Sequence, residues 1–275
     1  MSQVEGASPG PSVGTPTRGE ERELRALRSR RNRERSRRFL AEGTRGVRDL
    51  LASPLTVRLV VSTSSWEDDA AAAELRGLAS ERGVTWRSVS DAELTTYADT
   101  DTPQGIVAVG QVPTATLESL EPRGDRLLVL VLDAVQDPGN VGTLVRTAEA
   151  LGAAGVVLLP GTVDPWNPKA VRAASGACFR TPLVAAGWER LRPWLGAAEV
   201  RLFAAAAGAP PLPESLPPRV ALAVGNEGAG ISAATRRHAD ALVGIPLRGG
   251  AESLNVAAAA AILLFQLQPS SSTLP

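Results

Sequence analysis

The chain has 275 residues, with 29 Lys and Arg against 29 Asp and Glu, and 44% of the residues are hydrophobic. This composition excludes a wholly disordered chain and suits one large or two ordinary domains. Cys178 and His238 are the only residues of their kinds, so neither an intramolecular disulfide nor a Cys/His metal cluster can form. The longest apolar run, 256–265, is about half of the roughly 20 residues that a membrane span needs, and the N-terminus has no apolar signal core. We therefore expect a cytoplasmic protein with no membrane role and no bound metal.

The basic residues exclude several further classes of enzyme. Lys169 is the only lysine, and every other basic residue is an arginine. Because no Gly-Lys-Ser or Gly-Lys-Thr occurs, a Walker-type phosphate loop is excluded, and a Schiff-base enzyme would have to use Lys169. The excess of arginine reflects either a GC-rich genome or selection for phosphate binding.

The N-terminal residues predict a tail followed by a basic arm. Residues 1–19 are rich in Ser, Pro, Gly and Thr and almost lack large apolar side chains, so we expect them to be a disordered tail. From Arg18 to Arg48 there are 12 arginines and five glutamates, a strongly basic stretch hidden by the neutral total. It is either a solvated charged helix with pairs such as Glu21 and Arg25, or a contact with RNA phosphates that is blind to sequence.

A small α/β domain is predicted next, so that the arm and this domain together span residues 20–112. Its strands are expected at 57–61, 85–89 and 105–109, and its helix at 69–82. Residues 113–125, with Pro113, Pro122 and Gly124, are typical of a linker.

Residues 126–268 alternate continuous apolar strands with helices, which indicates an α/β domain with a mostly parallel sheet and helices on both faces. Strands are expected at 127–132, 156–159, 201–206, 220–224 and 242–245. Helices are expected at 141–151, 168–174, 188–195, 232–238 and 254–267. Ligands of such sheets bind beyond the carboxyl ends of the strands, so the loops after Leu132, Val224 and Ile245 are candidate sites. Residues 269–275 are expected to be a flexible tail.

The first candidate loop, 133–140, leads into the predicted helix at 141–151. Asn140 is a natural N-cap for that helix, whose apolar side chains recur at a spacing of three and four residues. Arg146 falls on another face, one turn after Gly142. Either Arg146 is a surface residue paired with Glu149, or the small Gly142 leaves room for an anionic group beside Arg146.

The second candidate loop, Gly-Asn-Glu-Gly-Ala-Gly at 225–230, has three glycines in six residues. It is either a plain turn or a place where a ligand approaches the main chain closely, with Asn226 and Glu227 as polar groups. Its glycine order differs from that of the dinucleotide-binding fingerprint. The third loop spans 245–255, and Ser253 can cap the helix after it. The alanines of that helix predict tight packing against another helix, within the chain or across a dimer.

Together the three loops resemble the SpoU/TrmH family of the SPOUT superfamily, the S-adenosylmethionine-dependent RNA 2′-O-ribose methyltransferases. The matching text is D-P-G-N-V-G-T-L-V-R-T-A at 137–148, G-N-E-G-A-G at 225–230, and I-P-L with S-L-N-V-A within 245–257, in the family's order. Residues 37–43 and 102–109 are similar to the small ribosomal-protein-like substrate-binding module that precedes the catalytic domain in many members. The resemblance covers about residues 30–268.

The resemblance implies a C-terminal α/β methyltransferase domain at 126–268 with a deep trefoil knot, preceded by a smaller ribosomal-protein-like RNA-binding domain. It implies S-adenosyl-L-methionine as the cofactor, RNA as the substrate with rRNA favoured over tRNA, and a homodimer through the knot and the C-terminal helix. The implied cofactor-binding residues are Gly225, Asn226, Gly230, Ile245, Leu247, Ser253 and Leu254. The implied catalytic residues are Asn140, Arg146, Glu227, Ser253 and Asn255.

The family's mechanism gives the matching arginine the role of base, but a guanidinium stays protonated in proteins. We therefore expect Arg146 to anchor a phosphate of the target nucleotide and to lower the pKa of its 2′-hydroxyl. We expect Asn140 to fix the loop and the proton to pass to water or Glu227. Cys178 is expected to be a buried core thiol and His238 a surface residue.

Three alternatives remain open from the sequence. The first is a knotted homologue that binds rRNA and transfers nothing, and the second is an unrelated α/β enzyme that uses a nucleotide. The third is the same chemistry on tRNA. The sequence also leaves open whether the protein has a self-protection role in an antibiotic producer.

Overall fold

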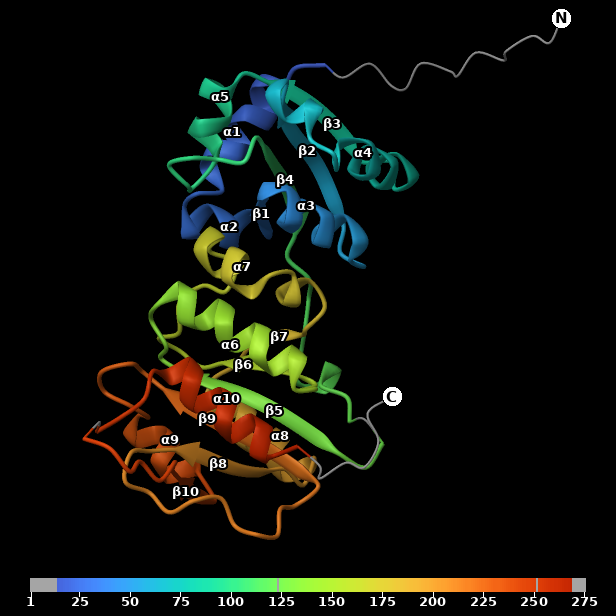
Figure 1. Cartoon of the computed structure of the whole chain (residues 1–275). Coiled ribbons are helices and arrows are strands. Elements are labelled where there is room, and N and C mark those ends of the chain that lie inside the picture. The colour runs from blue at the N-terminus through green and yellow to red at the C-terminus, as the bar shows by residue number, and fades with distance from the viewer. Residues whose placement is uncertain (1–13, 123, 251, 269–275) are drawn as a thin grey trace, which may run out of the picture. The chain divides into compact units, whose positions relative to one another are not determined.

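The computed structural model describes residues 14–122, 124–250 and 252–268. The chain divides into two compact units (Figure 1). The N-terminal unit comprises the chain up to Ala52 together with Thr56–Gln111, and the C-terminal unit comprises Ser53–Leu55 and the chain from Val112 onward.

The N-terminal unit is built on a four-stranded mixed sheet with the order β1-β4-β2-β3. Its strands are β1 (Arg38–Glu42), β2 (Val57–Thr63), β3 (Thr85–Val89) and β4 (Ile106–Gln111). β4 is antiparallel to β1 and β2, and β3 is parallel to β2. Sequence analysis missed β1 because its three buried residues, Phe39, Leu40 and Ala41, are too few to give a periodic signal.

The helices of this unit are α1 (Arg18–Ala26), α2 (Arg30–Ser36), α3 (Gly43–Ala52), α4 (Ala72–Glu81) and α5 (Asp91–Tyr97), with a 3₁₀ turn, η1, at Ser65–Asp68. Leu24 and Leu27 are buried against the sheet, in a cluster that also contains Tyr97. The predicted disordered tail was wrong for residues 14–19, because Gly14 pairs with Arg87 and Thr17 forms a capping box with Glu20 at the start of α1. Residues 1–13 of that tail lie outside the described residues.

The C-terminal unit contains a six-stranded, all-parallel sheet with the order β10-β8-β9-β5-β6-β7. Its strands are β5 (Leu127–Asp133), β6 (Gly155–Leu158), β7 (Leu183–Ala185), β8 (Arg201–Ala205), β9 (Arg219–Gly225) and β10 (Ala241–Val243). Its helices are α6 (Pro138–Ala150), α7 (Pro168–Ala174), α8 (Trp188–Ala197), α9 (Ala233–His238) and α10 (Val256–Gln266), with 3₁₀ turns η2 at Leu117–Ser119 and η3 at Ala177–Phe179. The predicted parallel sheet is confirmed, and of its strands only the three-residue β7 was not predicted.

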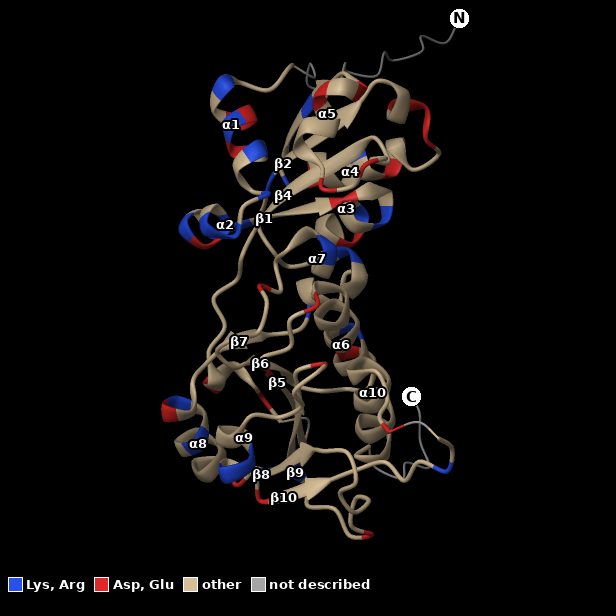
Figure 2. Ribbon diagram, turned by 90° about the vertical axis from the view of Figure 1, so that its left-hand side faces the viewer, with Lys and Arg blue, Asp and Glu red and all other residues tan. Residues whose placement is uncertain are grey.

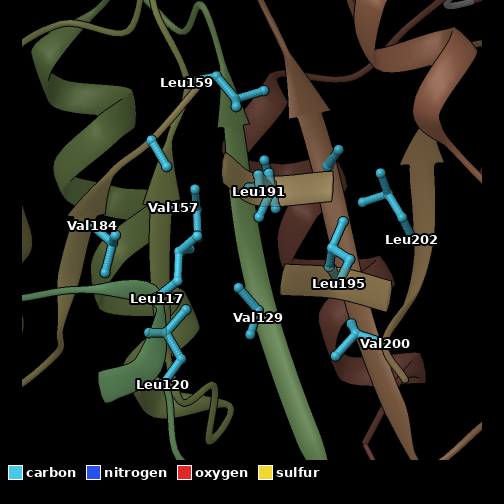
Figure 3. Close-up of a cluster of buried hydrophobic side chains, with 14 of the residues drawn as sticks. Leu117, Leu120, Val129, Val157, Leu159, Val184, Leu191, Leu195, Val200 and Leu202 are labelled. Atoms are coloured by element: carbon cyan, nitrogen blue, oxygen red, sulfur yellow. The ribbon is translucent and has the colours of Figure 1, made fainter. Parts of the chain in front are cut away.

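Successive residues of β5 point to opposite faces of this sheet, and helices cover both faces. Val129 and Val131 belong to a cluster on the face covered by α8, where Leu191 and Leu195 pack against them (Figure 3). α6 and α10 pack against each other, and each contacts a central strand of the sheet, β5 and β9 respectively. The central strands are therefore buried on both sides, which explains their continuous apolar runs.

Two smaller predictions concern the burial of Cys178 and His238. Cys178 is 2% exposed, as expected of a core thiol. His238 is half-buried and stacks on Trp188, with ring centroids 4.5 Å apart. In the described parts of the chain, no helix combines the length and the hydropathy of a bilayer span, and no group of three or more His, Cys, Asp or Glu residues is placed to hold a metal ion.

Candidate active site

The first two candidate loops leave neighbouring strands at the carboxyl edge of the parallel sheet. β5 and β9 pair along their length, and Asp133 at the end of β5 lies opposite Gly225 at the end of β9. The segments that follow, 134–137 and 226–232, therefore start side by side. The third loop leaves β10, two places further along the sheet, and returns to this edge at the start of α10.

A chain of hydrogen bonds joins residues from all three loops. Asn140 donates its Nδ2–H to Oε1 of Glu227 at 3.0 Å, and Oδ1 of Asn140 accepts from Nδ2 of Asn255 at 3.2 Å. Glu227 also accepts from the main-chain N–H groups of Gln136, at 3.2 Å, and Asp137, at 3.0 Å. The structure thus brings together three of the five predicted catalytic residues, Asn140, Glu227 and Asn255.

The cap of α6 differs from the predicted one. Asp137, not Asn140, is the N-cap, and its carboxylate accepts from the main-chain N–H of Asn140 at 2.9 Å. Pro138 occupies the first helical turn, where its fixed φ favours the helix and its missing N–H costs nothing. Lys169 of α7 donates to Asp137 at 2.9 Å, and this bond, followed by the bond from Asn140, lowers the pKa of Asp137. The side chain of Asn140 is thereby left free to bridge the other two loops.

The carboxylate of Glu227 is held in its charged form. Burial raises its pKa, but the bonds from the Asn140 side chain and from nearby main-chain N–H groups outweigh that effect, so the pKa lies below the ordinary 4.5. An ionised carboxylate whose oxygens already accept three hydrogen bonds is a weak proton acceptor at neutral pH. This arrangement suits Glu227 as an anchor for the first loop better than as a base.

The glycines of the second loop are needed by the turn itself. A Cβ at Gly225 would lie 2.2 Å from the carbonyl carbon of Gly230, and Gly230 has a positive φ of 68°. Asn226 accepts at Oδ1 from the N–H groups of residues 228 and 229 and donates from Nδ2 to the carbonyl of Ala134 at 3.0 Å. The loop is therefore a tight turn that is also fastened to the first loop.

Arg146 projects from α6 into solvent and makes no side-chain hydrogen bond or ion pair with the described residues. Of the two alternatives for Arg146, the pairing with Glu149 is not formed, because Glu149 binds Arg180 through both carboxylate oxygens. The lack of a side chain at Gly142 is explained by helix packing. A Cβ there would lie 2.3 Å from the carbonyl oxygen of Ala170, so α7 fills that space.

The third loop exposes both apolar side chains and main-chain groups. Leu247 and Leu254 are each 38% exposed. The main-chain groups of 245–250 and 252–254, which include Ile245 and Ser253, make no hydrogen bond with any described residue. Ser253 does not cap α10 as predicted, since Asn255 accepts there from the N–H groups of residues 257 and 258.

Sequence analysis missed one polar residue at this edge. Asp133 is 4% exposed, and its Oδ2 accepts from the main-chain N–H of Ser232 at 2.6 Å and from the hydroxyl of the fully buried Thr235 at 2.5 Å. It ties the end of the second loop to β5. An aspartate that directly ends a buried apolar strand was the signal that could have identified it.

An all-parallel sheet whose carboxyl edge carries three fastened polar loops is typical of α/β proteins that bind a ligand at their strand ends. Residues 127–265 match the SpoU rRNA Methylase family, and residues 21–108 match the MRM3-like substrate binding domain. The chain belongs to the SpoU rRNA methylase family. This confirms the resemblance inferred from the three loops, and by homology the C-terminal unit has the family's knotted fold.

Relatives of this chain are similar over nearly its whole length. The 23S rRNA (guanosine(2553)-2′-O)-methyltransferase of Bacillus subtilis is 37% identical over 90% of this chain and 95% of its own. The 23S rRNA (uridine(2479)-2′-O)-methyltransferase of Streptomyces viridochromogenes is 31% identical over 87% of this chain and 85% of its own. Among solved structures, the AdoMet-bound rRNA methyltransferase of Sinorhizobium meliloti is 31% identical, with a TM-score of 0.81 over 93% of this chain and 96% of that one.

Proposed function

We propose that this protein transfers a methyl group from S-adenosylmethionine to a ribose 2′-hydroxyl of 23S rRNA. The observation that carries the proposal is the hydrogen-bonded chain from Asn255 through Asn140 to Glu227, which makes one site of three loops distant in sequence. Two relatives that act on 23S rRNA, at a guanosine and at a uridine, support the substrate class. They support rRNA over the alternative of tRNA.

The third loop fits the proposed donor. S-adenosylmethionine has a flat apolar base with polar edges, and such ligands are held by apolar side chains together with a few main-chain donors and acceptors. Leu247 and Leu254 supply exposed apolar surface, and the main chain around Ile245 and Ser253 has unused hydrogen-bonding groups. The turn formed by Gly225, Asn226 and Gly230 lies at the end of β9, two places along the sheet from β10. When bound, S-adenosylmethionine supplies an electrophilic methyl group on a sulfonium.

The residues of the first loop would position the acceptor. Asn140 is held on both sides of its amide, by Glu227 and by Asn255, so its place at the edge of the site is fixed before substrate binds. Alignment of this kind supplies a large part of the rate enhancement in a displacement reaction. Positive charge of the sulfonium disappears as the carbon–oxygen bond forms, so a site that excludes water favours the reaction.

Arg146 would act on the substrate through its charge. Its guanidinium has no partner among the described residues, so it is available to bind a phosphate of the target nucleotide. A cation near the 2′-hydroxyl lowers the pKa of that hydroxyl. Because the oxygens of Glu227 are already occupied and its pKa is lowered, we assign the released proton to water.

A second copy of the chain would complete the assembly. Ile262 and Phe265, one turn apart on α10, are 38% and 67% exposed, and such neighbouring apolar side chains mark an interface. The alanines on the other side of α10 already pack within the chain, as Ala257 and Ala260 are buried. Sedimentation at several concentrations should show a dimer that Phe265→Glu dissociates, and a wild-type monomer would refute this assembly.

The test of the proposed function supplies the protein with methyl-labelled S-adenosylmethionine and an unmodified 23S rRNA transcript, followed by alkaline hydrolysis. A methylated 2′-oxygen cannot attack the neighbouring phosphate, so the label should appear in alkali-resistant dinucleotides. Label in mononucleotides would indicate base methylation. Transfer of the label to tRNA transcripts but not to 23S rRNA would identify tRNA as the substrate. RNA binding without binding of the donor in calorimetry would indicate a homologue that transfers nothing.

A further inference from the structure

The charges of α1 and α2 are sorted between an inner and an outer side. Glu20 accepts from Arg87 of β3. Glu23 is paired with Arg38 of β1 and with Arg58 of β2, so the carboxylates of both glutamates are bound by arginines of the sheet. Their side chains are only 16% and 15% exposed. Glu20 and Glu23 are therefore turned away from the outer side of α1, where Glu21 is the acidic residue and pairs with Arg25.

The arginines of α1 occupy the opposite side. Arg18, Arg22 and Arg25 follow at intervals of four and three residues, so they lie on one face of the helix. Leu24 and Leu27 mark the other face and are fully buried. Arg25 is engaged by Glu21 at 3.3 Å, whereas the side chains of Arg18 and Arg22 make no hydrogen bond or ion pair within the part of the chain that the structure describes.

The arginine surface continues through the turn into α2. Arg28 and Arg31 are exposed, and their side chains likewise have no partner among the described residues. Arg33, only 3% exposed, donates to the carbonyls of Leu27 and Arg28 at 2.8 and 2.9 Å and so fixes the junction between the two helices. Figure 2 shows how densely Lys and Arg occur on α1 and α2.

We propose that Arg18, Arg22, Arg28 and Arg31, which we call the outer arginine face, bind phosphates of the rRNA substrate. This inference rests on the proposed function, because it takes RNA as the partner. The guanidinium groups of these four arginines make no ion pair with the described residues and are well suited to bind phosphate oxygens, and four of them on a short helix pair can follow a backbone.

A membrane surface is a poorer partner for the same face. Helices that lie on membranes combine a basic face with exposed apolar side chains that enter the lipid. Leu24 and Leu27, on the opposite face of α1, are buried, and the large hydrophobic side chains exposed in the described chain all lie in the C-terminal unit. RNA phosphates need no such apolar contact.

The test compares two quadruple variants that remove the same charge. One is Arg18→Gln, Arg22→Gln, Arg28→Gln and Arg31→Gln in the outer arginine face. The control replaces four exposed arginines of α8, β8 and α9, namely R190Q, R201Q, R236Q and R237Q. Filter binding of a labelled 23S rRNA transcript is measured from 50 to 200 mM salt, with calorimetry of S-adenosylmethionine binding as a check on the C-terminal unit.

Each phosphate contact contributes about 0.7 to the slope of log affinity against log salt for single-stranded RNA, so losing four lowers the slope by about 2.8. The affinity of the wild type should therefore fall about 50-fold more than that of the face variant over this range. The control variant should keep the wild-type slope, and all three proteins should bind the donor equally. An unchanged slope in the face variant, an equal loss in both variants, or arginine-dependent binding to anionic vesicles in place of RNA would overturn the inference. Continued methylation of 23S rRNA by the wild type in any of these cases would leave the proposed function standing.

Discussion

Gly142 provides the sharpest test of how the helix that carries Asn140 and Arg146 is held. A Cβ at this position would lie 2.3 Å from the carbonyl oxygen of Ala170, 2.6 Å from the Cβ of Ala173 and 2.9 Å from the N atom of Ala174. Two of these three atoms belong to the main chain of α7, so no change of rotamer can relieve the contact. Gly142→Ala must therefore separate α6 from α7.

The two opposing effects can be estimated. Alanine favours a helix interior over glycine by about 1 kcal/mol, whereas forcing an extra methyl group into a packed site costs about 1–3 kcal/mol. Because main-chain atoms are the obstacle here, the cost should be at the upper end, and we expect a net loss of about 1–2 kcal/mol. Separation would also strain the bond between Lys169 and Asp137, which caps α6. A displacement of about 1 Å at Asn140 could lower kcat by up to about 100-fold.

Urea unfolding measures the first effect, and methyl transfer to 23S rRNA measures the second. Gly196→Ala in α8 is the matched control, since a Cβ there would meet no atom within 4 Å. The control should be neutral or stabilising, by up to about 1 kcal/mol, and should keep full activity. The reasoning fails if Gly142→Ala raises the urea midpoint as much as the control does.

Three further substitutions probe the fastened loops. Glu227→Gln should lower methyl transfer. The pKa of Glu227 in the folded state lies below 4.5, so its carboxylate stabilises the fold above pH 4.5, and this contribution is lost as the pH falls below that value. The stability of the variant should therefore depend less on pH below 4.5 than that of the wild type. Identical pH profiles of unfolding would count against this. Asp133→Asn should cost about 1–3 kcal/mol in urea unfolding, because it replaces one carboxylate oxygen with an NH2 group that needs an acceptor in a buried site and leaves a weaker acceptor for the bonds from Ser232 and Thr235. An unchanged midpoint would show that these buried bonds matter little. Arg146→Lys separates two roles in the transfer assay, since near-full activity means that positive charge alone suffices, and loss of activity means that the planar guanidinium is needed.

Local sequence patterns predicted the framework of the C-terminal unit better than the contacts within its site. Continuous apolar runs such as 127–132 and 220–224 indicated buried parallel strands, and the parallel arrangement placed the first two loops at one edge. The predicted N-caps of α6 and α10 were wrong, because each helix has more than one residue near its start whose side chain can accept from the first N–H groups. Pro138 shifts the start of α6 so that Asp137 caps it, and Asn255 takes the role expected of Ser253.

Partners distant in sequence could not be predicted from such patterns. Asn140 and Asn255 are 115 residues apart, and Glu149 binds Arg180 in place of its neighbour Arg146 on the same helix. The space beside Gly142 depends on where α7 packs, which no periodicity within α6 reveals. The resemblance to a family supplied the site residues, and the structure supplied the bonds that join three of them.

The central claim is that three loops act as one site that brings the methyl donor to a sugar hydroxyl. A crystal structure of the protein with bound S-adenosylmethionine tests it most directly. The account predicts electron density for the donor against Leu247, Leu254 and the turn at 225–230, with the amide of Asn140 still joined to Glu227 and Asn255. Density for the donor at another part of the molecule, or loops that separate when it binds, would contradict the account.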